Sequence, residues 1–163
     1  MPKPSPEATS SLPDALLTAF ADHEKANLAV IRALSDEAWQ AKPPGGRTRT
    51  IAAMVAHVHN VRVAWIEFAK AGKVPRKLDS STVTRAEAIE GFEATGAALA
   101  ALLGERLNGG RIAGFGSDAA HFLTYLVAHD AQHRGQILTQ GRLAGHPVAK
   151  EVAYGIWERY HGK

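Results

Sequence analysis

Two histidines, His129 and His133, stand four residues apart in the segment HDAQHRGQ, residues 129–136. The segment belongs to a long stretch whose apolar residues recur at helical spacing. On an α-helix, positions i and i+4 lie on the same face, so both imidazoles can point at one atom. Imidazole is largely uncharged near neutral pH and is the commonest metal ligand among side chains. The pair therefore offers half of a transition-metal site, although such a pair also occurs on the exposed rim of a helix.

The composition limits what could complete such a site. The chain has 163 residues, no cysteine and eight histidines. Disulfide bonds, thiolate ligands and a cysteine nucleophile are excluded. A metal ion would have to be held by His, Asp, Glu or water.

Charge and hydropathy indicate the compartment and exclude some partners. The formal charge is only +3, too weak and too dispersed to predict nucleic-acid binding. No apolar run reaches the roughly 18 residues that cross a bilayer, and the opening MPKPSPEATSSLP lacks the apolar centre of a signal peptide. We expect a cytoplasmic protein without membrane contact, with a disordered tail at residues 1–11 and one domain at residues 12–163.

Four long helices are predicted to position the histidines. Their apolar periodicity and end signals place them near residues 12–34, 51–71, 85–103 and 118–143, and a short helix or turn follows at 151–160. Residues 35–49 are expected to form a loop because they contain Pro43-Pro44-Gly45-Gly46. The pattern predicts an all-α four-helix bundle.

The other histidines are less clearly placed. His57 and His59 fall on opposite flanks of the predicted helix 51–71, and either could lie on the surface. His57 is the better inward candidate because Val61 and Phe68, which are expected to be buried, share its side. His23 is expected to be hydrogen bonded at the bundle edge, with a place near a ligand as the alternative.

Two stretches carry a resemblance to a known family. Thr50-Ile51, His57 seven residues after Thr50, and His129-x-x-x-His133-Arg134-Gly135-Gln136 resemble the DinB/YfiT-like superfamily of metalloenzymes. The stretch AHVHNVRVAW and the run from HDAQHRGQIL to GHPVAKEVAYGIW add to this likeness, which covers residues 12–160.

The resemblance implies a four-helix bundle of up-down-down-up type, which the connection of residues 72–83 is long enough to permit. It implies a metal triad of His57, His129 and His133, a nickel or zinc ion, and a homodimer. Relatives of this kind include transferases and isomerases that use low-molecular-weight thiols such as mycothiol and bacillithiol. His59 remains the competitor of His57 for the third place in the triad.

Neighbours of the triad are candidates for supporting or catalytic roles. Asp130 points about 100° around the helix from His129, so we expect it to orient His57 or to form a salt bridge with Arg134. Gln136 is a candidate for holding a substrate or water, and Gly135 is expected to permit close helix packing.

The predicted function is that of a metal-dependent enzyme acting on a small molecule, either a hydrolase or a transferase that uses a low-molecular-weight thiol. Because the chain has no cysteine, a thiol nucleophile would have to arrive with a cosubstrate. The alternatives are a non-catalytic metal-binding or stress-response module and a purely structural bundle.

Overall fold

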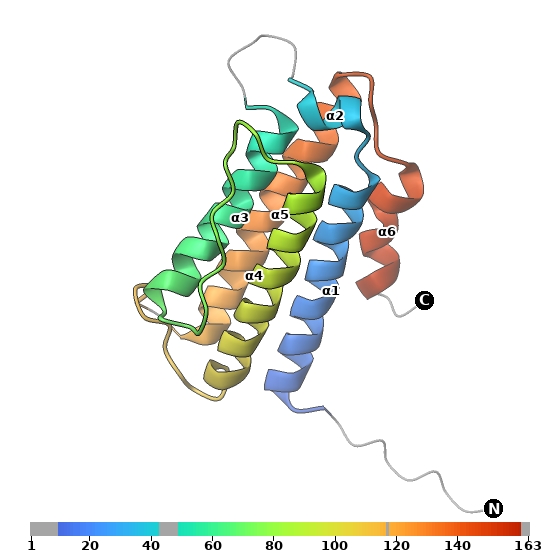
Figure 1. The fold of residues 1–163 in the computed structure, drawn as a ribbon. Coiled ribbons are helices and arrows are strands. Elements are labelled where there is room, and N and C mark those ends of the chain that lie inside the picture. The colour runs from blue at the N-terminus through green and yellow to red at the C-terminus, as the bar shows by residue number, and fades with distance from the viewer. Residues whose placement is uncertain (1–9, 43–48, 117, 161–163) are drawn as a thin grey trace, which may run out of the picture.

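The computed structural model describes residues 10–42, 49–116 and 118–160. All its regular elements are helices (Figure 1). They are α1 (Leu12–Ala33), α2 (Asp36–Gln40), α3 (Ile51–Phe68), α4 (Arg85–Arg106), α5 (Ala119–Leu143) and α6 (Lys150–Tyr160). The predicted all-α class is confirmed. Most of the predicted tail, and the Pro43–Gly46 stretch, lie outside the described residues.

Side-chain caps explain where the long helices begin. Thr50 accepts a hydrogen bond from the backbone N–H of Ala53 at the start of α3. Thr84 and Glu87 form a reciprocal capping box at the start of α4, and Asp118 caps α5. Each cap satisfies a backbone N–H that has no partner within its own helix.

Two predictions of where helices lie were wrong. The segment expected to be a loop contains α2, whose Trp39 is buried and donates its indole N–H to the Val83 carbonyl at 3.0 Å. That buried contact stabilises a single short helix that periodicity could not reveal. Helix α3 ends at Phe68 rather than near 71, because the chain turns through Lys70 and Gly72, with φ of 52° and 62°.

The four long helices α1, α3, α4 and α5 lie side by side (Figure 1). The connection between α3 and α4 runs back along the length of the bundle. The short helix or turn expected at 151–160 is helix α6, which packs along α1.

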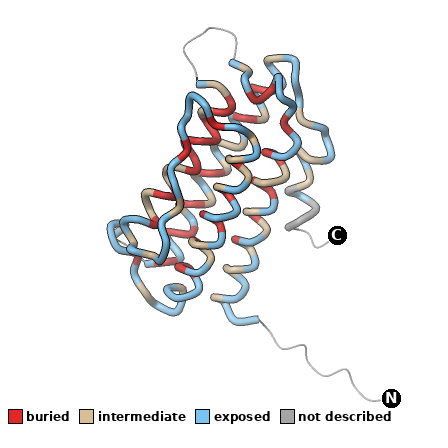
Figure 2. Tube along the Cα trace, in the orientation of Figure 1, coloured by how far each residue is buried: buried red, intermediate tan, exposed pale blue. Residues whose placement is uncertain are grey.

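Buried residues form two apolar clusters along the bundle axis, with exposure concentrated outside (Figure 2). One cluster lies towards α2 and includes Ile31, Val55 and Phe92. The other lies towards the opposite end and includes Phe20 and Phe122. Between the two, a layer of buried polar side chains crosses the bundle: His23, Asn27, Arg62, Thr95 and Asp130.

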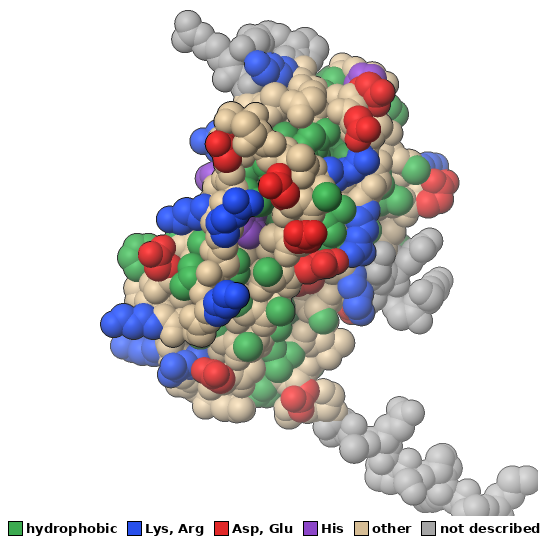
Figure 3. Space-filling view, in the orientation of Figure 1, with side chains coloured by type: hydrophobic (Ala, Val, Ile, Leu, Met, Phe, Trp, Pro, Cys, Tyr) green, Lys and Arg blue, Asp and Glu red, His purple; other side chains and the backbone are tan. Residues whose placement is uncertain are grey.

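The distribution of charged side chains on the surface agrees with the small net charge of the chain. On the face shown in Figure 3, basic and acidic side chains are interspersed rather than gathered by sign. Among the described helices, none combines the length and the apolar character that crossing a membrane requires.

Of two glycines of α4, Gly96 lies close against Glu24 of α1, and Gly104 has space beside it. A Cβ on Gly96 would lie 2.5 Å from Oε2 of Glu24, whereas one on Gly104 would meet nothing closer than 3.9 Å. Alanine is the better helix former by about 1 kcal/mol. We therefore expect Gly104→Ala to raise the free energy of unfolding by up to about 1 kcal/mol and Gly96→Ala to lower it. Urea unfolding followed by circular dichroism measures both, and a stabilised Gly96→Ala protein would contradict the packing of this layer.

Candidate metal centre

Three half-buried histidines converge where α3 and α5 face each other. The His57 ring centroid lies 5.8 Å from that of His129 and 5.0 Å from that of His133, and the His129 and His133 centroids are 4.7 Å apart. One ring nitrogen from each histidine lies within 4.8 Å of the other two. The i, i+4 spacing on α5 places two of these rings one turn apart, and α3 brings the third against them.

Hydrogen bonds fix the tautomers of the two α5 histidines. Nδ1–H of His129 donates to Oδ1 of Asp130 at 3.2 Å. Nδ1–H of His133 donates to Oε1 of Gln136 at 2.9 Å. In each ring the proton is therefore held on Nδ1, and Nε2 keeps its lone pair. Metal-binding histidines are commonly held in this way by a carboxylate or carbonyl oxygen.

The local electrostatics favour the uncharged form of His57 and His133. Burial lowers the pKa of His57, and the positive charge of Arg49 and the neighbouring His133 and His129 lower it further. Burial and His129 likewise lower the pKa of His133, and this outweighs the opposing effects of Gln136 and Asp130. Neutral rings with free lone pairs are the form that binds a metal ion.

Asp130 connects the histidines to the buried polar layer. Its other oxygen, Oδ2, accepts from Nε and Nη2 of Arg62 at 3.1 and 2.5 Å, and Nε2 of His23 lies 3.2 Å from it. Burial by itself would raise the pKa of the Asp130 carboxyl. The Arg62 charge and the hydrogen bonds from His129 and His23 hold that pKa well below its ordinary value of 3.8. Asp130 is therefore a permanent carboxylate.

Arg62 is wholly buried and is neutralised from two sides. Its guanidinium donates two hydrogen bonds to Glu24, at 2.7 and 2.6 Å, in addition to those to Asp130. It also lies over the Phe92 ring, 4.5 Å from the centroid. The oxygens of Asp130 and Glu24 come close to His23 in a second group with possible ligand atoms, but the guanidinium already supplies the positive charge there.

The partners of Asp130 correct both sequence-based expectations. Asp130 orients His129 rather than His57, and it does not pair with Arg134, whose guanidinium donates to Oδ1 of Asn27. The reason is that Asp130 points into the bundle, towards α1 and α3. His23 and Asn27 also lie inside this layer and not at the bundle edge.

The other neighbours of the three histidines lie on the exposed side of α5. Gln136 contacts the ring of His133 itself, so in this structure its carbonyl oxygen holds a histidine. Gly135 is exposed, and a Cβ there would meet no atom within 4 Å, so the expectation of close packing was wrong. His121, which lies eight residues before His129 on α5, is exposed as well.

His59 lies away from the three converging rings. It is fully buried on the other flank of α3, where its Nε2–H donates to the Arg76 carbonyl at 2.9 Å. Its Nδ1 has no hydrogen-bond partner and lies against Gly91. The sequence argument for His57 was nevertheless imperfect, because Phe68, used as a sign of the buried side, is 64% exposed.

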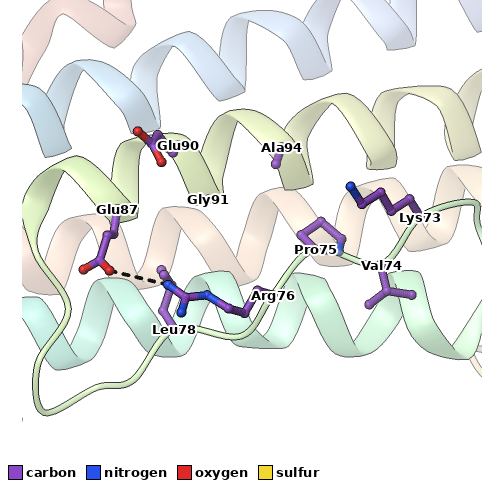
Figure 4. A pocket seen from close by; sticks show the side chains of 9 residues that line it. All are labelled: Lys73, Val74, Pro75, Arg76, Leu78, Glu87, Glu90, Gly91 and Ala94. Atoms are coloured by element: carbon purple, nitrogen blue, oxygen red, sulfur yellow. Dashed lines mark hydrogen bonds and ion pairs between the residues drawn. The ribbon is translucent and has the colours of Figure 1, made fainter.

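A large cavity lies on the His59 side of α3, not beside the three histidines. It has a volume of about 650 Å³ and is lined by Lys73, Val74, Pro75, Arg76, Leu78, Glu87, Glu90, Gly91 and Ala94 (Figure 4). At one end Arg76 pairs with Glu87 at 3.4 Å. Its lining contains no histidine, so size alone does not identify the chemical site of this chain.

Sequence reasoning missed Arg62 and Glu24. The available signal was an arginine in the otherwise apolar face of the stretch AHVHNVRVAW, since a charge there requires a buried partner. No pattern identified which acidic residues from α1 and α5 would provide it.

We expect Asp130→Asn to lower the free energy of unfolding by about 3 kcal/mol at neutral pH, because it leaves the buried Arg62 without one of its two counter-charges. Since the folded-state pKa of Asp130 is depressed, its contribution is present above the ordinary value of 3.8 and is lost as the pH falls below it. The curves of wild type and variant should therefore converge in acid.

Urea unfolding over a pH series measures this effect. Asp22→Asn is the matched control, because Asp22 pairs only with the exposed Lys25, and such pairs contribute less than about 1 kcal/mol. Equal losses in both variants would show that Asp130 is not a special buried carboxylate.

Comparison with known proteins places the chain in a family. No curated protein and no solved structure gives a significant match to this sequence. The family model described as DinB family matches residues 7–157, which is most of the chain. That span includes all four long helices and the three converging histidines. The chain therefore belongs to the DinB family.

Proposed function

We propose that this protein is a metal-dependent enzyme in which His57, His129 and His133 hold one divalent transition-metal ion, nickel or zinc. The convergence of the three rings, with a nitrogen from each within 4.8 Å of the others, carries the proposal. Membership in the DinB family supports it independently.

The donor set fits such an ion. Imidazole suits zinc and nickel, and three neutral nitrogen ligands are the usual set of a catalytic rather than a structural site. When bound, the ion would leave at least one position for substrate and would act there as a Lewis acid on an oxygen or sulfur atom. The three histidines are half-buried, so a small molecule can reach them.

The surrounding residues are better suited to positioning than to proton transfer. Asp130 is buried, ion-paired and held as a carboxylate, so it orients His129. Gln136 does the same for His133. We infer a hydrolase or a transferase that uses a low-molecular-weight thiol, and the absence of cysteine means that the chain itself supplies no thiol. Metal binding without turnover would favour the non-catalytic alternative.

The family likeness also bears on topology and setting. We propose the up-down-down-up order for the four long helices, which is supported by the connection that runs back between α3 and α4. A cytoplasmic location and a small-molecule partner rather than a nucleic acid remain part of this proposal.

The test is the metal content of single alanine variants, measured by elemental analysis after loading with one equivalent of zinc or nickel. His57→Ala, His129→Ala and His133→Ala should each lose stoichiometric binding, because two imidazoles are too few to retain the ion. His59→Ala should keep the metal, and so should His121→Ala, the exposed control on α5. If His57→Ala keeps the metal ion and His59→Ala loses it, His59 is the third ligand in place of His57. If both His129→Ala and His133→Ala keep the metal ion, the proposed site is refuted.

Metal affinity should also depend on pH in a defined direction. Because burial lowers the pKa of His57 and His133 from the ordinary value, protons should compete with the metal ion for these two rings at a lower pH than they would for exposed histidines. The metal-free protein should remain folded by circular dichroism, since a bundle of this size has its own core.

A homodimer is a separate proposal, motivated by the family resemblance and by the alanine-rich α4. Light scattering at micromolar concentration should give about twice the chain mass of 17.4 kDa. A mass equal to one chain would reject it.

A further inference from the structure

A small cavity opens beside His57, on the side of α3 that faces the connection to α4. It has a volume of about 210 Å³ and is lined by Arg49, Ala53, His57, Asn60 and Ser80. Ala53, His57 and Asn60 follow one another at steps of four and three, so they form a single stripe along the start of α3, and Arg49 lies just before the Thr50 cap. The cavity therefore joins one of the three converging histidines to an arginine at the start of the same helix.

The walls of this cavity are held in place. The side chain of Asn60 donates to the Leu78 carbonyl at 2.9 Å and accepts from the Leu78 N–H at 2.8 Å. This pair of hydrogen bonds fixes the connection that carries Ser80 against α3. At the other end, the Arg49 carbonyl accepts from Nε2 of Gln140 at 3.0 Å, which ties the residue to α5 through its backbone.

The charge in the cavity is unbalanced. Among the described residues, its lining includes Arg49 and no acidic residue. In the part of the chain that the structure describes, Arg49 has no ion-pair partner, in contrast to Arg62 and Arg76. The positive charge reaches the histidines, since it lowers the pKa of both His57 and His133. The cavity therefore offers a positive charge to an anionic group of a ligand.

The chemistry of the lining defines the group that fits. A guanidinium presents a planar fork that matches the two oxygens of a carboxylate, and Asn60 and Ser80 add polar edges. The small volume suits one such group on a short chain and not a large ligand. A substrate could thus place its reactive atom at the three histidines and its carboxylate beside Arg49.

We propose that this cavity is the substrate-recognition subsite of the protein, in which Arg49 binds the carboxylate of a small acidic substrate whose reacting group lies at His57, His129 and His133. The inference rests on the proposed function, because it needs a substrate at the histidine site. Arg49 acts in it as a specificity-determining residue.

The probes are short thiols that differ only in their far end. Mercaptoacetate, mercaptopropionate and mercaptobutyrate each carry a carboxylate, and the corresponding mercaptoalcohols carry a hydroxyl. Binding to the cobalt(II)-loaded protein is followed by the thiolate absorption bands. At least one mercaptocarboxylate should bind roughly tenfold tighter than its alcohol, the advantage expected for a charge-assisted pair of hydrogen bonds.

Variants assign the preference to Arg49. Arg49→Gln should abolish it, so that each mercaptocarboxylate binds no tighter than its alcohol, and Arg49→Lys should restore part of the difference. Arg76→Gln is the control, because Arg76 is an exposed arginine of the other cavity, and it should keep the preference.

The results distinguish a failure of the Arg49 subsite from a failure of the histidine metal site. Equal affinities for acid and alcohol in the wild-type protein, or a preference that survives in Arg49→Gln, would overturn the subsite and leave the histidine site intact. If no thiol of either kind binds to the metal-loaded protein, the open site of the proposed function is itself overturned.

Discussion

The buried charge of Arg62 is the constraint on which the rest of the structure depends. A guanidinium with no exposed surface requires counter-charges in contact with it, and it finds them in the buried Asp130 of α5 and the partly buried Glu24 of α1. One side chain of α3 thereby fixes the relative positions of three helices. The layer also divides the apolar core into two clusters, and replacing any one of its charged side chains by an apolar one would leave a buried charge without a partner.

The same ion pair determines the geometry of the histidine site. Asp130 has two oxygens, and Arg62 and His23 occupy Oδ2. The remaining oxygen, Oδ1, accepts the Nδ1 proton of His129 and so leaves the lone pair of that ring on Nε2. A buried salt bridge is weak evidence for net stability. Its value here lies in holding one ring in one tautomer and one orientation.

The sequence predicted the features that depend on local chemistry. Thr50, Thr84 and Glu87 can indicate helix starts in a sequence because their side chains satisfy nearby N–H groups, and the structure shows them in these caps. The spacing of His129 and His133 required only one helix. Features that depend on distant contacts were missed. Helix α2 is stabilised by Trp39 against Val83, 44 residues further along the chain, and the choice of Asp130 as partner of Arg62 spans 68 residues. The cavity at Arg49 depends on the hydrogen bonds between Asn60 and Leu78, which hold the connection between α3 and α4 in place. Helical periodicity does not predict these contacts.

The most direct test of the central claim is long-range proton–nitrogen NMR of the imidazole rings, recorded before and after one equivalent of zinc. In the metal-free protein, the rings of His129 and His133 should be neutral with the proton on Nδ1. Zinc should then shift the Nε2 resonances of these two rings together with one ring nitrogen of His57, and should leave His23 and His59 unchanged. Protonation of His129 on Nε2, or a zinc response from His23 or His59 in place of His57, would contradict the account.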